Sequence, residues 1–322
     1  MIELTLTTAR PRGSYRQKYR VAILMGTYNA QQFLALQLDS IARQTWQEWV
    51  LWISDDGSQD RSLSIINEFQ QRVGKERITL LPGPQTGFAD NFLSLVCNPV
   101  IQADYYAFAD QDDIWEADKL IRALTLLLPK GNQSPALYCS RTRIVDEFDH
   151  EIGFSPLFRK PPSFANALTQ SLSGGNTMIF NHAARKLLLE AGRVNIVSHD
   201  WWTYLLITGC GGSVVYDSYP SVRYRQHDTN LVGTNNGVKN KLKRLRKLWR
   251  GDFRLWVDNN INALFMIRKK LDQNNRGLLI KFMRGRNGWI LPRLMVLKQV
   301  GLYRQTILGN LGLFLAVIFR KI

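Results

Sequence analysis

Residues 21–30 read VAILMGTYNA, an apolar run of five residues that ends in a polar loop. After this loop, Leu34, Leu38 and Ile41 recur at the three- and four-residue spacing of an amphipathic helix. The stretch therefore predicts a buried strand, a loop, and a helix that packs one face against the strand.

The same unit recurs twice. Residues 49–58 read WVLWISDDGS and precede a helical apolar pattern, and residues 105–113 read YYAFADQDD and precede a helix expected to run to Leu128. Alternating strands and helices of this length favour an α/β fold with a doubly wound, mainly parallel, Rossmann-like sheet. Ligands bind beyond the carboxyl ends of the strands in such sheets, so the three polar loops are expected to meet in one crevice.

The alternation of strands and helices becomes irregular after about residue 136, and we interpret this half of the domain as the side that binds a second substrate. Short apolar runs predict short strands at residues 136–139, 177–180, 213–216 and 221–224. A GTNNG stretch predicts a linker at residues 233–237. We therefore expect a polar N-terminal tail (1–20), an α/β domain (21–237) and a basic, amphipathic helical region (238–322).

Positive charge is concentrated at the C-terminal end. The chain has a formal net charge of +16, but residues 238–322 hold 20 Lys and Arg against 3 Asp and Glu, while the remainder holds 22 against 23. A hydrophobic content of 45% supports a real core and excludes disorder as the main state. The charge asymmetry indicates a near-neutral body joined to a region that meets phosphate groups.

Cysteine usage and the N-terminus indicate a compartment. Cys97, Cys139 and Cys210 stand far apart without a CxxC pair, so neither a disulfide framework nor a zinc site is predicted. Residues 5–20 are largely polar, and the apolar run after them is shorter than that of a secretory signal. We therefore expect the catalytic body to lie in a reducing cytoplasm.

Three carboxylates, Asp110, Asp112 and Asp113, follow the third apolar strand. Repulsion between such neighbours is costly unless a cation or hydrogen-bond donors offset it. A divalent metal is the natural partner, because Mg²⁺ prefers one or two carboxylates together with phosphate oxygens. An isolated cluster of this kind is more often a solvated acidic turn, but its position after a buried strand favours the metal.

Asp55 and Asp56 end the second strand. One acid can cap the helix expected to begin near Asp60, but a cap does not require two. A carboxylate at this place can accept the N–H of a pyrimidine base, and Tyr28 on the neighbouring loop offers a ring face for the base.

These motifs carry a family resemblance. The stretches GTYNA (26–30), SDDGSQD (54–60) and FADQDDIW (108–115) resemble, in order and spacing, the family 2 glycosyltransferases with the GT-A fold. The later stretches SGGNT (173–177), HDWW (199–202) and YRQH (224–227) are similar to the bacterial rhamnosyltransferase branch of that family. The resemblance covers about residues 21–233 and leaves the basic C-terminal region outside.

The resemblance implies a role for individual residues. A nucleotide-sugar is expected at Thr27, Tyr28, Asn29, Asp55, Asp56, Gly87, Asn91, Asp110, Gln111, Arg223 and Arg225. Asp110 and Asp112 would form the DXD pair that bridges a divalent metal, Mg²⁺ or Mn²⁺, and the diphosphate, with His227 as a further metal contact. Arg223 and Arg225 would stabilise the leaving group. The acceptor is expected at Gly175, Asn176, Trp201 and Trp202.

Asp200 falls where the family places its catalytic base. Glycosyl transfer leaves a nucleoside diphosphate whose charge must be met by positive charge, while the acceptor hydroxyl on the opposite face needs a general base. One in-line displacement of this kind inverts the anomeric centre. Without the resemblance, an N-cap role for a helix over residues 201–208 would explain Asp200 equally well.

Histidines are weak signals by themselves. A lone histidine near the end of a domain is more often structural than a ligand, although the Arg-Gln-His context favours function for His227. No comparable argument assigns a role to His150, His182 or His199.

The resemblance implies an inverting glycosyltransferase that moves a sugar, with L-rhamnose from dTDP-L-rhamnose favoured, to a lipid-linked saccharide in bacterial cell-surface polysaccharide synthesis such as that of O-antigen. A UDP-hexose donor and a non-catalytic, lipid-tethered binding module are the alternatives. A nicotinamide-dependent oxidoreductase is disfavoured because the first strand lacks GxGxxG. An aspartate-nucleophile phosphatase would place its DxD after the first strand.

The basic C-terminal region favours a membrane surface over nucleic acid, because no nucleic-acid-binding motif accompanies it. Basic residues interleaved with Leu, Trp and Phe are typical of an in-plane interfacial helix on anionic lipid. Residues 307–319 are apolar but shorter than the roughly 20 residues that a spanning helix needs. We therefore expect a peripheral protein on the inner face of the bacterial cell membrane, with a helix packed on the body as the alternative for residues 307–319.

Overall fold

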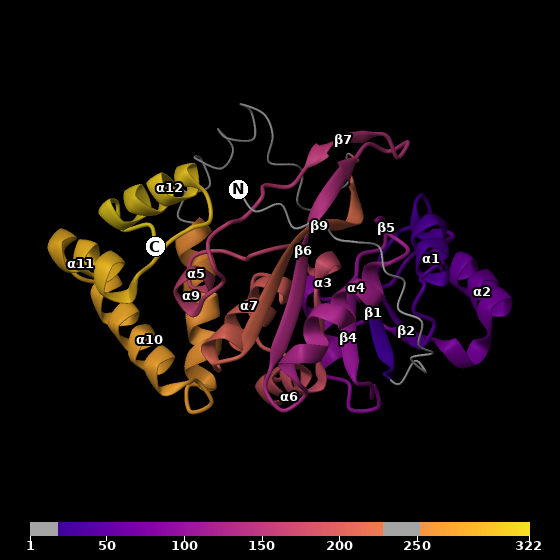
Figure 1. Ribbon diagram of the computed structural model, residues 1–322, viewed down its shortest axis with the longest axis horizontal. Coiled ribbons are helices and arrows are strands. Elements are labelled where there is room, and N and C mark those ends of the chain that lie inside the picture. Colours follow the sequence, from indigo (N-terminus) through magenta and orange to yellow (C-terminus); the bar gives the residue numbers. More distant parts are fainter. Residues whose placement is uncertain (1–18, 228–251) are drawn as a thin grey trace.

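A computed structural model describes residues 19–227 and 252–322 of the chain. Within these residues, one mixed sheet of nine strands has the order β3-β2-β1-β4-β8-β6-β9-β5, with β7 paired to β6 (Figure 1). The strands are β1 (Val21–Thr27), β2 (Trp49–Asp55), β3 (Ile78–Pro82), β4 (Tyr105–Ala109), β5 (Ile114–Trp115), β6 (Ala136–Val145), β7 (Glu151–Phe154), β8 (Ile179–Asn181) and β9 (Ser213–Arg225).

The first half of the sheet is parallel, as the sequence predicts. β1 pairs in parallel with both β2 and β4, and β2 pairs in parallel with β3. β8 then runs antiparallel to β4 and to β6, whereas β9 runs parallel to β6. The predicted α/β fold with a mainly parallel sheet is confirmed.

Helices cover both faces of this sheet (Figure 1). Alternate residues of β1 point to opposite faces, so that Val21, Ile23 and Met25 join one hydrophobic cluster while Ala22 and Leu24 join the other. The helices are α1 (Leu34–Ala42), α2 (Ser62–Val73), α3 (Phe88–Val96), α4 (Lys119–Leu127), α5 (Phe164–Ala167), α6 (His182–Ala191), α7 (His199–Gly209), α9 (Asp252–Met266), α10 (Gln273–Arg286), α11 (Ile290–Val300) and α12 (Ile307–Ile318), with 3-10 turns η1 (Lys75–Arg77), η2 (Leu128–Lys130) and η3 (Gly175–Thr177).

The strand pattern of the second half differs from the prediction. The runs at residues 213–216 and 221–224 belong to one strand, β9, because β6 pairs with it continuously through two shifts of register. Ser140 lies opposite Asp217, Arg141 opposite Pro220 and Thr142 opposite Val222, so β9 accommodates two extra residues at the first shift and one at the second. The sequence around Pro220 predicted two strands, because a bulge within one strand can be recognised only from its pairing with the neighbouring strand.

The C-terminal helices pack on the body. The Asn275 side-chain amide donates hydrogen bonds to the carbonyls of Thr208 (3.0 Å) and Gly209 (3.2 Å) at the end of α7. The indole of Trp201 stacks on Phe253 of α9, with ring centroids 6.4 Å apart. The alternative given for residues 307–319, a helix packed on the body, describes one face of α12, which buries Leu313, Ala316 and Val317. The basic stretch at 239–250 lies outside the described residues.

None of the helices in the described part of the chain is both long enough and apolar enough to cross a membrane. α12 contains 12 residues, well below the length of a spanning helix.

The turn between α7 and β9 depends on Gly212. A Cβ atom there would lie 2.7 Å from the Pro135 carbonyl oxygen and 2.8 Å from the Ile207 carbonyl oxygen, and neither backbone atom can move freely. We expect Gly212→Ala to lower the free energy of unfolding by about 1–3 kcal/mol in urea titrations. Gly277→Ala is the matched control, because a Cβ atom in that helix meets nothing within 4 Å and should stabilise by about 0.5–1 kcal/mol. Equal stability of both variants would contradict this account of the turn.

Candidate active site

The loops after β1 and β4 are joined by one side chain. Gln111 accepts a hydrogen bond from the Tyr28 backbone N–H (2.7 Å) and donates one to the Tyr28 carbonyl (3.2 Å). The Tyr28 ring remains 56% exposed. Gln111 therefore holds the two loops together and leaves the aromatic face open, so its own contact with a nucleotide is secondary to this bracing.

The loops after β1 and β2 are also joined by hydrogen bonds. The Asn29 N–H donates to the Ser58 hydroxyl, and the Asn29 side-chain carbonyl accepts from the Gln59 N–H, both at 2.9 Å. Asn29 has a positive φ of 47°, a conformation that Asn tolerates better than most residues. The loop geometry thus uses Asn29 structurally, beside the predicted nucleotide contact.

Asp55 organises its own loop. It accepts hydrogen bonds from the Thr27 hydroxyl (3.1 Å), from the Gly57 N–H (3.2 Å), and from both the N–H (2.9 Å) and the hydroxyl (2.6 Å) of Ser58. Asp55 is buried. The neighbouring Asp56 is more exposed and accepts one hydrogen bond from the Gln85 N–H (2.6 Å). Of the two acids, Asp56 is therefore the better placed to meet a base.

Asp113 is a structural member of the acidic cluster. It is fully buried, accepts a hydrogen bond from the Asn176 side-chain amide, and accepts another from the Arg225 N–H (3.3 Å). Lys119, also fully buried, donates to the Asn176 carbonyl and lies 3.5 Å from the Trp115 ring centroid. Burial raises the pKa of Asp113 well above its usual value and lowers that of Lys119 well below. Asn176 therefore links these buried groups.

Asp110 and Asp200 lie close enough for their charges to interact. Burial, the neighbouring Asp112 and then Asp200 raise the pKa of Asp110 to about 7, and Lys119 opposes this shift. Burial likewise raises the pKa of Asp200, although hydrogen bonds from Ser198, from its own N–H and the Trp201 N–H, and from Gly175 oppose the rise. The structure thus brings the end of β4 and the start of α7 together, although they lie far apart in sequence.

Asp112 meets His227 across the site. The Asp112 carboxylate lies 2.8 Å from His227 Nε2, and both side chains are partly exposed. The Phe33 ring packs against the imidazole with centroids 4.9 Å apart. Both residues are predicted metal contacts, and the structure places their side chains next to each other.

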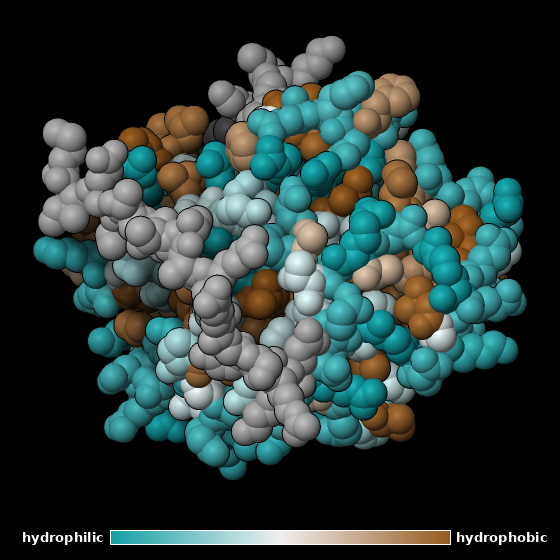
Figure 2. Space-filling model, turned by 45° about the vertical axis from the view of Figure 1, so that its right-hand side comes forward, coloured by the Kyte–Doolittle hydropathy of each residue, from teal (hydrophilic) through white to brown (hydrophobic). Residues whose placement is uncertain are grey.

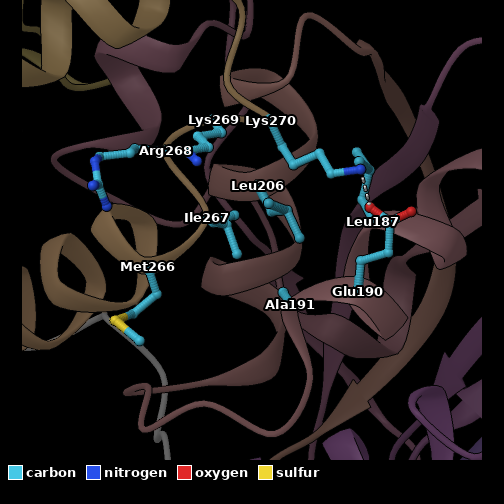
Figure 3. A pocket seen from close by; sticks show the side chains of 9 residues that line it. All are labelled: Leu187, Glu190, Ala191, Leu206, Met266, Ile267, Arg268, Lys269 and Lys270. Atoms are coloured by element: carbon cyan, nitrogen blue, oxygen red, sulfur yellow. Dashed lines mark ion pairs between the residues drawn. The ribbon is translucent and has the colours of Figure 1, made fainter.

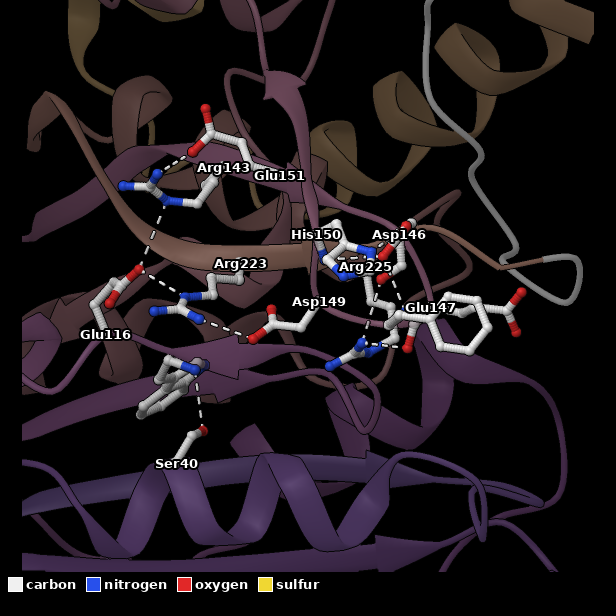
Figure 4. Close-up of polar contacts among 12 residues, drawn as sticks. Ser40, Glu116, Arg143, Asp146, Glu147, Asp149, His150, Glu151, Arg223 and Arg225 are labelled. Carbon is white, nitrogen blue, oxygen red and sulfur yellow. Dashed lines mark hydrogen bonds and ion pairs between the residues drawn. The ribbon is translucent and has the colours of Figure 1, made fainter.

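Both predicted arginines are engaged by groups of the protein itself. Arg225 is buried and donates to the carbonyls of Asp112, Asp146 and Glu147 at 2.8–3.2 Å, so it holds the acidic loop rather than a ligand. Arg223 pairs with Glu116 (3.0 Å) and Asp149 (2.8 Å) in a polar pocket of about 310 Å³ (Figure 4). Strand alternation could not reveal these acidic partners, because they come from distant loops.

Trp201 and Trp202 do not support the predicted stacking on an acceptor sugar. Trp202 is fully buried, and the Trp201 indole N–H donates to the Ala167 carbonyl (2.7 Å) within the core. Every residue of α7 except Asp200 is buried, so this helix is a core element with one polar side chain at its N-terminus. Ser198 is its N-cap residue and Asp200 lies in the first turn.

His199 is a site residue that the sequence analysis did not assign. Its ring stacks on Phe92 of α3 (centroids 3.8 Å apart) and lies edge-on to Phe108 (4.7 Å). Neither ring nitrogen has a hydrogen-bond partner among the described residues, and burial lowers the pKa of the imidazole to about 3. A Cβ atom on Gly175 would lie 2.2 Å from Nε2, so the glycine makes room for this ring. The only sequence feature that pointed to His199 was its position next to Asp200.

Gly87 ends the loop after β3, and Asn91 lies in the first turn of α3. Gly87 has φ +104° and open space around it, whereas Asn91 is buried and donates to the Ser54 carbonyl (3.0 Å). Asn91 therefore ties the start of α3 to the end of β2. Any contact of this loop with a nucleotide-sugar falls more naturally to the open Gly87.

The acidic residues fit a divalent metal as a partial ligand set. In residues 19–227 and 252–322, no three His, Cys, Asp or Glu side chains are grouped as a complete metal site. Asp112 with His227 and the nearby Asp110 offer carboxylate and imidazole donors, and Mg²⁺ or Mn²⁺ commonly takes its remaining ligands from phosphate oxygens and water.

A cavity lies away from these acidic residues. A cavity of about 420 Å³ is lined by α6, the later part of α7 and the chain after α9, including Leu206 and Lys270, which pairs with Glu190 at 2.9 Å (Figure 3). It does not include Asp110, Asp112 or Asp200. Cavity size alone therefore does not identify the chemical site.

Sequence comparison gives related proteins. The family described as Glycosyl transferase family 2 matches residues 22–187. A dTDP-rhamnosyl transferase from Shigella flexneri, RfbG, is 31% identical over 251 residues, which cover 74% of this chain and 84% of that protein. A glucosyltransferase from Escherichia coli, WfgD, described as using UDP-Glc and an α-D-GlcNAc-diphosphoundecaprenol, is 32% identical over 116 residues, covering 36% of this chain and 44% of that protein.

Solved structures share the fold. Staphylococcus aureus TarS, in complex with UDP-GlcNAc, superposes with a TM-score of 0.55 at 13% identity and covers 93% of this chain and 90% of its own. The Pyrobaculum calidifontis mannosyltransferase PcManGT, in complex with GDP-Man and Mn²⁺, gives a TM-score of 0.50 at 14% identity, with 94% and 86% covered. These likenesses confirm the expected GT-A type fold.

The raised pKa of Asp110 gives a pH test. Without metal, the folded state keeps this proton up to about pH 7, so the carboxyl stabilises the fold at low pH and loses that contribution as the pH rises from about 4 to 7. A cation must displace the proton, so Mn²⁺ with a nucleoside diphosphate should raise Tm more at pH 8 than at pH 6. Asp110→Asn should remove this difference, whereas Asp149→Asn in the polar pocket should retain it. Equal shifts at both pH values in the wild-type protein would contradict the assignment.

Proposed function

The chain belongs to glycosyltransferase family 2, and we propose that it transfers L-rhamnose from dTDP-L-rhamnose to a lipid-linked saccharide in the synthesis of a bacterial surface polysaccharide. The donor is supported by the 31% identity to a dTDP-rhamnosyl transferase across most of both chains. The lipid-linked acceptor is supported by a relative whose name specifies a diphosphoundecaprenol-linked acceptor.

One observation carries the chemical assignment. The η3 turn joins the two sides of the site, because the Asn176 amide donates to Asp113 after β4 and the Gly175 N–H donates to Asp200 in the first turn of α7. A donor-side carboxylate cluster and a separate, single carboxylate thus lie on either side of one turn. An inverting transfer requires this separation, because the leaving group departs on the side opposite to the attacking hydroxyl.

The donor side binds the nucleotide through fixed loops. The exposed Tyr28 ring offers a face for the base, and Asp56 offers a carboxylate for a base N–H. The hydrogen bonds among Gln111, Asn29 and their neighbours hold these loops in place before a ligand arrives. Pre-ordered loops reduce the entropy lost on binding.

Asp110, Asp112 and His227 are the residues that would hold Mg²⁺ or Mn²⁺. The bound cation would offset the negative charge that develops on the leaving diphosphate. Arg225 contributes indirectly, because its hydrogen bond to the Asp112 carbonyl (3.2 Å) holds the backbone of the acidic loop.

Asp200 acts as the general base. Its carboxylate accepts the acceptor hydroxyl proton while the oxygen attacks the anomeric carbon and the bond from that carbon to the diphosphate oxygen breaks. A pKa raised by burial makes this carboxylate a stronger base than an exposed aspartate. His199, held neutral and stacked on Phe92, packs the base-bearing helix against the donor loop.

A UDP-hexose donor is the second candidate, favoured by the relative described as using UDP-Glc. A panel of dTDP-L-rhamnose, UDP-glucose and GDP-mannose with a polyprenyl-diphosphate saccharide separates the two candidates by product mass. We expect transfer from dTDP-L-rhamnose alone. Transfer only from UDP-glucose would replace the donor, and no transfer with any donor would contradict the enzyme assignment for the acceptors used.

The base assignment is tested with Asp200→Asn. Because a base acts mainly in the transition state, we expect kcat to fall by a factor on the order of 10²–10⁴, while donor affinity in calorimetry stays within a few-fold of wild type. Asp149→Asn, in the separate pocket around Arg223, is the control and should keep the wild-type kcat and donor affinity. A parallel collapse of donor affinity in Asp200→Asn would make Asp200 a donor-binding residue.

A further inference from the structure

α12 presents an apolar face to solvent. Ile307 is 89% exposed, and Leu311 (55%) and Phe314 (45%) follow at the spacing of one helix face, with Leu308 (68%) beside them. The opposite face buries Leu313, Ala316 and Val317 against the body. One side of α12 therefore holds the helix on the protein, and the other side has no described segment covering it.

Further apolar side chains are exposed on and next to α11. Trp289 is 87% exposed, and Leu291 and Met295 are also exposed. The Arg293 guanidinium donates to the carbonyls of Val317 (2.8 Å) and Ile318 (2.9 Å), so the beginning of α11 lies beside the end of α12. We call the exposed residues Ile307, Leu308, Leu311 and Phe314 of α12 the apolar face.

The face formed by the first helices shows a different surface. The view that brings the right-hand side of Figure 1 forward shows apolar residues as separate patches among hydrophilic ones (Figure 2). On α1, α2 and α4, for example, Leu36, Leu63 and Ile121 are each only 39–45% exposed. Scattered apolar residues of this kind are normal on soluble proteins, whereas a contiguous apolar surface marks an interaction site.

Charge identifies the occupant. Residues 273–322 contain nine Lys and Arg and no Asp or Glu. Arg286 is buried and pairs with Asp258 (2.7 Å), whereas Arg276, Lys281, Arg284, Lys298 and Arg320 are exposed. An apolar surface in a segment with these exposed cations suits an anionic lipid surface, because acyl chains accept the apolar side chains while lipid phosphates meet the cations. Two copies of the same cationic face would repel each other, which disfavours self-association.

The apolar face is coupled to the base-bearing helix. Just before α12, the Tyr303 carbonyl accepts hydrogen bonds from Asn166 (3.0 Å) and Thr169 (2.8 Å) at α5. The Ala167 carbonyl of α5 in turn accepts the Trp201 indole N–H (2.7 Å), next to Asp200. The segment just before α12 is therefore connected through α5 to α7, the helix that carries the proposed base.

We propose that the apolar face is a docking surface for an anionic lipid bilayer, with α12 lying in the plane of the interface. Twelve residues span about 18 Å as a helix, too short to cross a bilayer but sufficient to lie along it. Docking would keep the protein at the bilayer that carries the lipid of the acceptor. This last step rests on the proposed lipid-linked acceptor.

Vesicle sedimentation with the full-length protein tests the docking surface. The variant changes Ile307, Leu311 and Phe314 together to Gln, and the matched control changes Leu36, Leu63 and Ile121 together to Gln. At low salt, wild type and control should bind vesicles containing phosphatidylglycerol much better than purely phosphatidylcholine vesicles. At about 0.5 M salt, where charge attraction is largely screened, the α12 variant should bind at least tenfold more weakly than the control.

Other results would overturn the proposal. Equal binding of variant and control at high salt would remove the apolar face as the docking element, and equal binding to neutral and anionic vesicles would remove the charge selection. Dimerisation of wild type that the α12 variant abolishes, without vesicle binding, would assign the face to a second copy instead.

Failure of docking can be distinguished from failure of the proposed function. Sedimentation requires no catalysis, so Asp200→Asn should bind vesicles like wild type. The α12 variant should transfer sugar to a water-soluble acceptor analogue at the wild-type rate and lose activity on a vesicle-embedded acceptor. Transfer to both acceptors at wild-type rates would contradict the docking role while leaving the proposed function intact.

Discussion

Carboxylates crowded at the carboxyl edge of a buried sheet impose the main constraint on this molecule. Asp110, Asp112, Asp113 and Asp200 face one another in a region where burial raises the pKa values of Asp110, Asp113 and Asp200. The fold meets this cost with Lys119 and with the Asn176 amide. Repulsion that remains between Asp110 and Asp112 is a reason for a cation and a diphosphate to bind there.

The surrounding loops are arranged to keep this edge in place. Hydrogen bonds of Gln111, Asn29 and Arg225 join loops that follow different strands. On the other side, α7 is a core helix whose N-terminus presents Asp200. Hydrogen bonds through α5 join α7 to the segment before α12, and so connect the proposed catalytic site to the surface that we assign to lipid.

The parallel strands, the acidic loops and the family could be predicted from sequence, because apolar runs that end in DxD-like clusters are local patterns. The environments of Arg225, Trp201 and Trp202 could not be predicted. A cation two residues from a histidine looks like a phosphate ligand until the carbonyls of Asp112 and Glu147 are seen around it. Likewise, the position of His199 depends on stacking against Phe92 and on the space left by Gly175, and both residues are distant in sequence.

The central claim is that the edge formed by Asp110, Asp112 and His227 receives a metal-bound diphosphate while Asp200 faces it. Crystals soaked with dTDP and Mn²⁺, measured at the manganese absorption edge, test this claim most directly. The account predicts one strong anomalous peak bonded to Asp110 or Asp112, with the diphosphate beside it and the base near Tyr28. Ordered nucleotide with its manganese elsewhere, for instance in the cavity lined by Leu206 and Lys270, would contradict the account.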